Sequence, residues 1–252
     1  MRRTLLSALS VTAMLGFAAG TLATAGDEAK AIIAKAIKAH GGEEALTKYK
    51  ASQSKHKGTR VVGGAGEVEF TQDVSIMLPD KVKDTLRLQI KNRTVTIVTV
   101  YNGDSVSIEA NGKAVQVTDK FKEAAAESIY RTRVTRLVSL VKDKDYELSL
   151  LGEIKVEGKP AVGVRVSSKG HKDVNLFFNK ETGMLVKSEH RALDQGGKEV
   201  DEEHIILEHQ KTQAGIAFPK RILVKRDGET VMQSEVTEAK SFEKLDDSEF
   251  QK

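Results

Sequence analysis

Polar and apolar positions alternate along most of the chain, and this pattern predicts β-strands that bury one face. The alternation is clearest between residues 67 and 90, and a β-branched run follows at 94–100. Further strands are predicted at 104–110, 162–166, 174–178, 184–193, 199–210, 218–226 and 230–242. About a dozen short strands separated by turn residues, with only three prolines, predict one large curled antiparallel sheet or barrel.

Two stretches depart from this alternation and predict helices. Residues 27–40 carry apolar side chains at the i, i+3, i+4 and i+7 spacing of one helical face, with Asp27 as the predicted N-cap and Gly41-Gly42 as the end. Residues 119–141 also have helix-forming sequence, but the apolar face of Phe121 and Ile129 differs from that of Leu137 and Val141. We therefore predict two short helices there, with a bend near residues 129–132.

The first 25 residues have the pattern of a secretory signal. Arg2 and Arg3 precede an apolar stretch at 5–19, and Ala23-Thr24-Ala25 supplies the small-x-small pattern of a cleavage site. The apolar stretch is shorter than the roughly 20 residues that span a bilayer. We predict cleavage after Ala25, a periplasmic location, and no stable membrane insertion after cleavage. The mature part, residues 26–252, is predicted to form a single domain.

Charge and cysteine content narrow the class of protein. There is no cysteine, so neither a lipid-modified cysteine nor a disulfide is possible and the core must hold the fold alone. The signal removes two arginines and no acid, so the net charge falls from +4 to about +2. The basic stretch at 48–60 has no interleaved aromatic residues. These properties argue against a nucleic-acid partner. This stretch is predicted to be an exposed strand, with His56 and Arg60 at a cavity mouth as the alternative.

No arrangement of residues predicts catalysis or metal binding. Gly103-Asp104-Ser105 resembles an esterase block, but it follows an Asn-Gly turn and leads into a strand, which favours a hairpin turn. The histidines and acids between His190 and His209 lie on one predicted hairpin without a metal-ligand spacing, and His204 and His209 are predicted on opposite faces. We interpret this hairpin as solvated and charged. The sequence therefore predicts no catalytic residue, no metal and no cofactor.

Several segments together resemble a known superfamily. They are the leading helix at 27–40, the Leu78-Pro79 step, the hairpin at 100–108 with Asn111-Gly112, the hairpin at 177–185, and the tail at 245–250. In this order they resemble the outer-membrane lipoprotein carrier and receptor superfamily, the LolA/LolB-like or outer-membrane lipoprotein-sorting proteins. The resemblance covers nearly all of residues 27–252 and lies mostly in the order of elements. It transfers no polar site residue.

The resemblance implies a mainly β fold with helices, a single-domain unclosed antiparallel β-barrel with an N-terminal helix and a short helical lid. It further implies an apolar concave face that binds lipid or the acyl chains of lipoproteins. The apolar positions of the clearest strands are then the expected ligand-binding residues, Val68, Phe70, Val74, Ile76, Leu86, Leu88 and Ile90. The expected lid residues are Phe121, Ile129, Leu137 and Val141.

The predicted function is that of a non-catalytic periplasmic carrier or binding protein for a hydrophobic ligand. Two alternatives stay open. One is a scaffold or interaction protein of the envelope, with a filled sheet interior and other envelope proteins as partners. The other is a hydrolase, for which no site is visible in the sequence.

Overall fold

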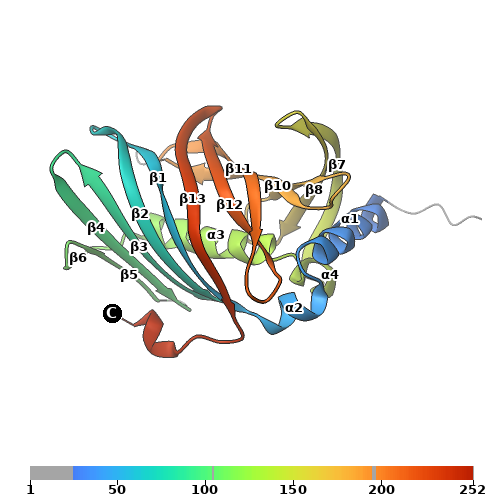
Figure 1. The fold of residues 1–252 in the computed structure, drawn as a ribbon, viewed down its shortest axis with the longest axis horizontal. Coiled ribbons are helices and arrows are strands. Elements are labelled where there is room, and N and C mark those ends of the chain that lie inside the picture. The colour runs from blue at the N-terminus through green and yellow to red at the C-terminus, as the bar shows by residue number, and fades with distance from the viewer. Residues whose placement is uncertain (1–24, 104, 195–196, 252) are drawn as a thin grey trace, which may run out of the picture.

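Thirteen strands form a single antiparallel sheet in the computed structural model, which describes residues 25–103, 105–194 and 197–251. In the order of the sheet they are β6 (Lys113–Val115), β5 (Ser105–Ala110), β4 (Arg93–Asn102), β3 (Lys81–Ile90), β2 (Gly66–Met77), β1 (Ala51–Val62), β13 (Glu229–Phe242), β12 (Ala217–Arg226), β11 (Glu199–Lys211), β10 (Leu185–Leu193), β9 (Val174–Asn179), β8 (Lys159–Ser168) and β7 (Tyr146–Val156). The sheet curves but does not close, with β6 and β7 at its edges (Figure 1). The predicted mainly β, unclosed antiparallel fold is confirmed.

The first and last strands of the chain meet at the centre of the sheet. β1 pairs with β13 from Ala51 opposite Phe242 to Arg60 opposite Met232. The two halves of the sheet are otherwise built from hairpins between neighbouring strands, because short turns favour antiparallel partners. The strand predicted in the basic stretch is confirmed as β1, and it lies at the centre of the sheet. Lys55 and Lys57 face outward from a central strand and form ion pairs with Glu238 and Glu235 on β13.

The helices are α1 (Ala25–Ala39), α2 (Glu43–Lys48), α3 (Asp119–Thr135), α4 (Ser139–Lys142) and a 3₁₀ helix at Asp247–Phe250. α3 crosses one face of the sheet behind β1, β13 and β12 in Figure 1, and α1 lies beside β7. We call the face that α3 covers the inner face and the opposite one the outer face. No helix in the described part of the chain is long and apolar enough to cross a membrane.

The main apolar core lies on the inner face, between the helices and β7–β10. Its buried members come from three helices and two strands. They are Ile33 and Ala36 of α1, Tyr130 and Val134 of α3, Leu140 of α4, Val164 of β8, and Leu176 and Phe178 of β9. This burial explains the helical spacing of α1, since Ala29, Ile33, Ala36 and Ile37 form its buried face.

The C-terminal segment covers part of the outer face near β1 and β2. Phe250 is 2% exposed and packs with Ala51 and Met77. The Ser75 hydroxyl donates a hydrogen bond of 2.8 Å to Oε1 of Glu249. The sheet thus has buried side chains on both faces in this region.

Two local predictions about the helices are wrong. α3 continues without interruption through residues 129–132, and the helical region is broken instead at Leu137, which adopts a φ of 68° and is 1% exposed. The apparent change of face arose from Phe121, which is 36% exposed and does not belong to the buried face of α3. Asp27 lies within the first turn of α1, not at its N-cap, where its charge still favours the positive end of the helix dipole.

Both Asn-Gly turns are confirmed as hairpins. Asn102 pairs with Ser105 at the β4–β5 turn, and Ala110 pairs with Lys113 at the β5–β6 turn. Asp104 lies outside the described residues. Because Ser105 enters a strand directly and is exposed, the esterase block has no strand-to-helix turn around it.

Candidate functional site

A cavity of about 350 Å³ lies on the inner face between the C-terminal half of α3, the α1–α2 junction and β10–β12. We call it the inner cavity. Its apolar lining comes from α2, the break after α3, and the strands: Leu46, Ile76, Leu137, Leu185, Ile206, Ile216, Phe218 and Ile222. Ile206 and Ile222 are paired across β11 and β12, so the two strands present these side chains to the cavity together.

One guanidinium lines the inner cavity. Arg136 follows the last turn of α3 and donates a 2.7 Å hydrogen bond from Nη2 to Oγ of Ser52 on β1. Burial lowers the pKa of Arg136, and no carboxylate forms an ion pair with it among the described residues. Arg136 is half-buried, and a partly desolvated cation without a carboxylate partner favours an anionic ligand group beside it.

Two histidines line the same cavity near α1. The rings of His40 and His209 lie edge to face with their centroids 6.2 Å apart. His40 Nδ1 lies 2.7 Å from the Ala36 carbonyl oxygen, which fixes Nδ1 as the donor, while Nε2 of His209 has no hydrogen-bond partner. Burial lowers the pKa of His40, and burial followed by the charge of His40 lowers the pKa of His209 to about 4.

His204 also lines the inner cavity, so the prediction that His204 and His209 point to opposite faces is wrong. In a regular strand, two residues five positions apart point to opposite faces of the sheet. β11, however, shifts register against β12 between Ile206 and Glu208 and again before His209. An extra residue in a strand reverses the face of everything that follows it.

The β10–β11 hairpin carries a buried polar cluster that contradicts its interpretation as solvated. His190 lies directly opposite Glu202, and both are less than 10% exposed. Glu202 Oε2 accepts a 2.7 Å hydrogen bond from Nε of Arg226, and its Oε1 lies 2.8 Å from Nε2 of His204 and 3.3 Å from Nε2 of His190. We call His190, Glu202 and His204 the hairpin cluster.

The surroundings set the protonation of the hairpin cluster. Burial lowers the pKa of His190 to about 4. Burial alone would raise the pKa of Glu202, but the neighbouring imidazoles and the Arg226 guanidinium outweigh it and hold that pKa well below its usual range. At neutral pH the cluster therefore contains a carboxylate and a neutral His190.

A second polar group lies beside β1 on the inner face. Nε2 of Gln72 donates a 2.7 Å hydrogen bond to Oδ2 of Asp84, whereas Oδ1 of Asp84 and Nε of Arg60 have no partner. Burial, opposed by Gln72 and the charge of Arg60, raises the pKa of Asp84 to about 6. The charges of Arg226 and Glu202 both affect the pKa of Arg60, so this polar group interacts electrostatically with the hairpin cluster.

The expected ligand-binding residues fall into two sets. Val68, Phe70 and Leu88 are buried against one another, with Leu86 and Ile90 packed around them. Val74 and Ile76 are half-buried, and among the seven only Ile76 lines the inner cavity. Their role in ligand binding stays a prediction.

The expected lid residues are also divided. Ile129 is buried and Leu137 lines the inner cavity, whereas Phe121 and Val141 are among the exposed large apolar side chains. α3 is held by Tyr130, whose ring stacks on His171 at 4.0 Å between centroids, and by Glu127, which contacts His171 Nδ1 at 2.9 Å. The N-terminal half of α3 is more exposed than its C-terminal half.

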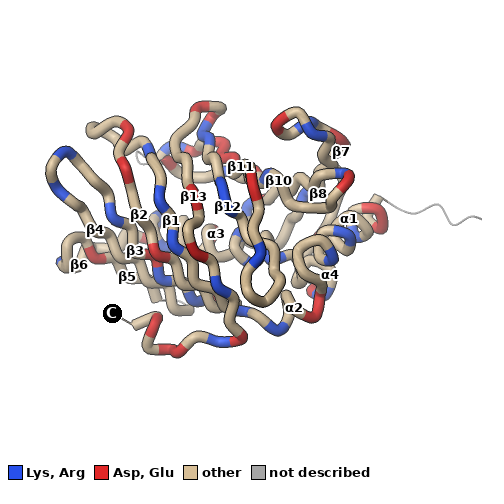
Figure 2. The backbone as a smooth tube through the Cα atoms, in the orientation of Figure 1, with Lys and Arg blue, Asp and Glu red and all other residues tan. Residues whose placement is uncertain are grey.

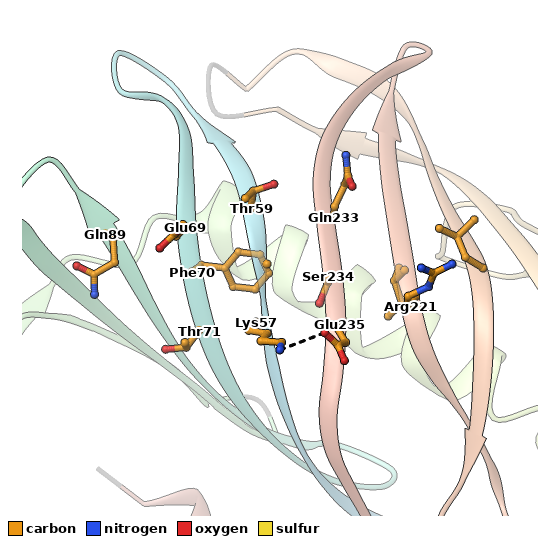
Figure 3. Close-up of a pocket in the computed structure, with 13 residues that line it drawn as sticks. Lys57, Thr59, Glu69, Phe70, Thr71, Gln89, Arg221, Gln233, Ser234 and Glu235 are labelled. Atoms are coloured by element: carbon orange, nitrogen blue, oxygen red, sulfur yellow. Dashed lines mark ion pairs between the residues drawn. The ribbon is translucent and has the colours of Figure 1, made fainter.

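A larger groove of about 650 Å³ lies on the outer face, and Figure 3 shows its lining. It is open, and polar or charged residues outnumber its apolar members Phe70, Leu207 and Ile222. Lys57 and Glu235 are joined across it by an ion pair of 3.2 Å. Figure 2 shows both signs of charge along the strands here. We favour the inner cavity as the candidate site because ligand pockets are usually concave, mostly apolar and equipped with a few polar groups.

Sequence reasoning missed Leu46, Arg136, Ile206, Ile216 and Ile222. Ile206 and Ile222 could have been identified from the sequence, since both lie in predicted strands and neighbour one another across a short hairpin. Arg136 had no such signal, because only the path of α3 brings it to Ser52.

Solved structures share this fold. An outer membrane lipoprotein-sorting protein domain from Vibrio parahaemolyticus superposes with a TM-score of 0.54 at 8% identity, over 89% of this chain and 97% of the other. A LolA superfamily protein from Nitrosomonas europaea gives 0.54 at 13% identity, also over 89% and 97%. A DUF1329 family protein from Desulfovibrio piger gives 0.53 at 13% identity, over 88% and 97%.

The resemblance to the LolA/LolB-like superfamily is thereby confirmed at the level of the fold. No protein-family model matches the sequence. No curated protein matches it either.

Proposed function

We propose that this protein is an exported, periplasmic and non-catalytic carrier or binding protein for a hydrophobic ligand, either a lipid or the acyl chains of lipoproteins. The observation that carries the proposal is the inner cavity, which is lined mainly by aliphatic side chains and covered by α3. Its volume of about 350 Å³ falls in the range of small-molecule sites. The signal-like residues 1–25 and the name of the Vibrio parahaemolyticus relative support the compartment and the ligand class.

The inner cavity combines features that suit an amphipathic ligand. Ile206, Ile222 and Ile76 offer an apolar wall for hydrocarbon, and Arg136 offers one cation at the end of α3. An acyl chain with an anionic end would bury its methylenes, each worth about 0.8 kcal/mol, and neutralise the guanidinium.

The test uses the full chain, expressed with its own N-terminal residues and recovered from the periplasm. We expect native mass spectrometry to detect co-purified acyl species, and an apolar fluorescent dye to bind and be displaced by a long-chain fatty acid. Ile206→Glu should reduce dye affinity at least tenfold, because it places a charge in the inner cavity.

The matched control is the next residue on the same strand. Leu207 is 42% exposed and lines the outer groove, so Leu207→Glu should leave dye binding unchanged. Equal loss in both variants, or no dye binding in the parent protein, would refute the proposal.

One observation favours the scaffold alternative. Val68, Phe70 and Leu88 are buried against one another on β2 and β3, as the side chains of a filled sheet interior would be. A scaffold would give a clean mass free of acyl species and would not bind the dye.

A further inference from the structure

The side chains of the hairpin cluster converge as the ligands of a metal ion do. One ligand atom from each of His190, Glu202 and His204 lies within 4.8 Å of the other two. Oε1 of Glu202 is shared by both imidazoles, at 2.8 Å from Nε2 of His204 and 3.3 Å from Nε2 of His190. Tetrahedral ligands at about 2.0–2.1 Å from a zinc ion lie about 3.3 Å apart, so small side-chain shifts would complete such a set.

His190 supplies an independent observation. Its side chain is 3% exposed, Nδ1 has no hydrogen-bond partner among the described residues, and the one contact given for Nε2 is Oε1 of Glu202 at 3.3 Å. Leaving buried polar atoms unpaired is unfavourable, so a buried imidazole normally has a partner for each nitrogen. Nε2 of His190 faces the carboxylate that His204 also faces, so an ion between the three would satisfy it.

Arg226 prepares the carboxylate for this role. Its Nε donates a 2.7 Å hydrogen bond to Oε2 of Glu202, so the other carboxylate oxygen, Oε1, faces the two imidazoles. Partners of this kind orient ligating carboxylates in metal sites. The arginines also add positive charge, since Arg131 of α3 interacts with Glu202 as well. They would therefore favour an anion or hydroxide as the fourth ligand.

We propose that His190, Glu202 and His204 form a binding site for a divalent transition-metal ion of the zinc class, with one coordination position left open. Two imidazoles and one carboxylate are the ligands that Zn²⁺ uses in sites with an open position. His204 lines the inner cavity and its side chain is 39% exposed, so the ion can be reached from that side. The site stands independently of the proposed acyl ligand.

The test is a titration of the untagged full chain, first stripped with a chelator, with Zn²⁺ against a chromophoric competitor and with Co²⁺ followed by visible absorption. We expect one ion per chain with a dissociation constant of micromolar or tighter, and intensified Co²⁺ absorption from a four-coordinate site. His204→Gln should weaken binding at least tenfold. His209→Gln, on the same strand and the same cavity, should not change it.

A second measurement does not depend on any variant. Histidine side-chain NMR should shift the Nε2 resonances of His190 and His204 on Zn²⁺ addition and leave those of His171 in place. Binding weaker than micromolar, equal loss in His204→Gln and His209→Gln, or shifts confined to other histidines would each overturn the proposal. The cluster would then be a buried ion network around Arg226.

Discussion

Arg136 donates a hydrogen bond from Nη2 to the Ser52 hydroxyl, and this contact joins the end of α3 to β1 across 84 residues of sequence. It is the direct tie between the helix that covers the inner cavity and the strand at the centre of the sheet. The donor is a cation and the acceptor is neutral, so the contact leaves the charge of Arg136 available to a ligand.

Replacing Arg136 should therefore weaken the binding of anionic ligands and not that of neutral ones. We expect Arg136→Gln to weaken binding of a long-chain fatty acid about tenfold, equivalent to about 1.4 kcal/mol, and to leave binding of the matching fatty alcohol unchanged. Competition for the bound apolar dye measures both. Arg133→Gln is the control, because Arg133 lies one turn earlier on α3 and does not line the inner cavity. If both ligands weaken equally, Arg136 acts through packing.

α3 should open in two steps. Its C-terminal half contains the buried Ile129, Tyr130 and Val134, whereas residues 119–123 are exposed. We expect amide hydrogen exchange in 119–126 to be faster than in 128–135, since few buried contacts hold that half. A saturating fatty acid should slow exchange in the C-terminal half, beside the inner cavity. If the exchange rate is uniform along α3 and does not change when the fatty acid binds, the helix is a fixed part of the core and not a lid.

His56 should make stability depend on pH. Its Nε2 lies 2.8 Å from Oγ of Ser54, its Nδ1 lies 3.5 Å from Oγ of Ser234, and the charged group nearby is Asp73. Burial lowers the pKa of His56 to about 4, against 6.5 for the free side chain. The unfolded chain therefore binds a proton first as the pH falls, and the folded state loses stability between pH 6.5 and about 4.

His56→Gln removes this titration while keeping polar contacts to both serines. Over that pH window we expect the parent protein to lose on the order of 2–3 kcal/mol more unfolding free energy than the variant does. Urea melts at pH 7, 5.5 and 4 measure the difference. Parallel curves would mean that His56 is protonated as easily in the folded protein as in the unfolded chain.

Gly58 should tolerate no side chain. A Cβ at this position would lie 1.9 Å from the Gln233 carbonyl oxygen on β13, because the two strands approach closely there. Phe70 is the register partner of Gly58 on β2. We expect Gly58→Ala to cost about 1–3 kcal/mol of unfolding free energy, from strain in the two strands.

The control for Gly58 is the neighbouring outward residue. Lys57→Ala removes only a surface ion pair with Glu235, so its effect should stay within about 0.5 kcal/mol. Thermal melts of the two variants, measured side by side, decide the matter. Equal midpoints would show that the strands separate there without cost.

The sequence by itself determined most of the strands, their turns and the leading helix, whereas β7 was not among the predicted strands. Alternation at Val68 and Phe70, the Asn102-Gly103 and Asn111-Gly112 turns, and the spacing of Ile33 and Ile37 in α1 are local properties, which each segment carries alone. The strand pattern indicated a curled antiparallel sheet or barrel, and the resemblance to the LolA/LolB-like superfamily implied that it is unclosed.

The tertiary structure alone decided which side chains meet. The register shifts of β11 bring His209 to the face of His204, and the β10–β11 register sets His190 opposite Glu202. The break at Leu137 and the path of α3 bring Arg136 to Ser52. A single-residue shift reverses the face of a strand, and such shifts depend on how distant strands fit together, so no local pattern can report them.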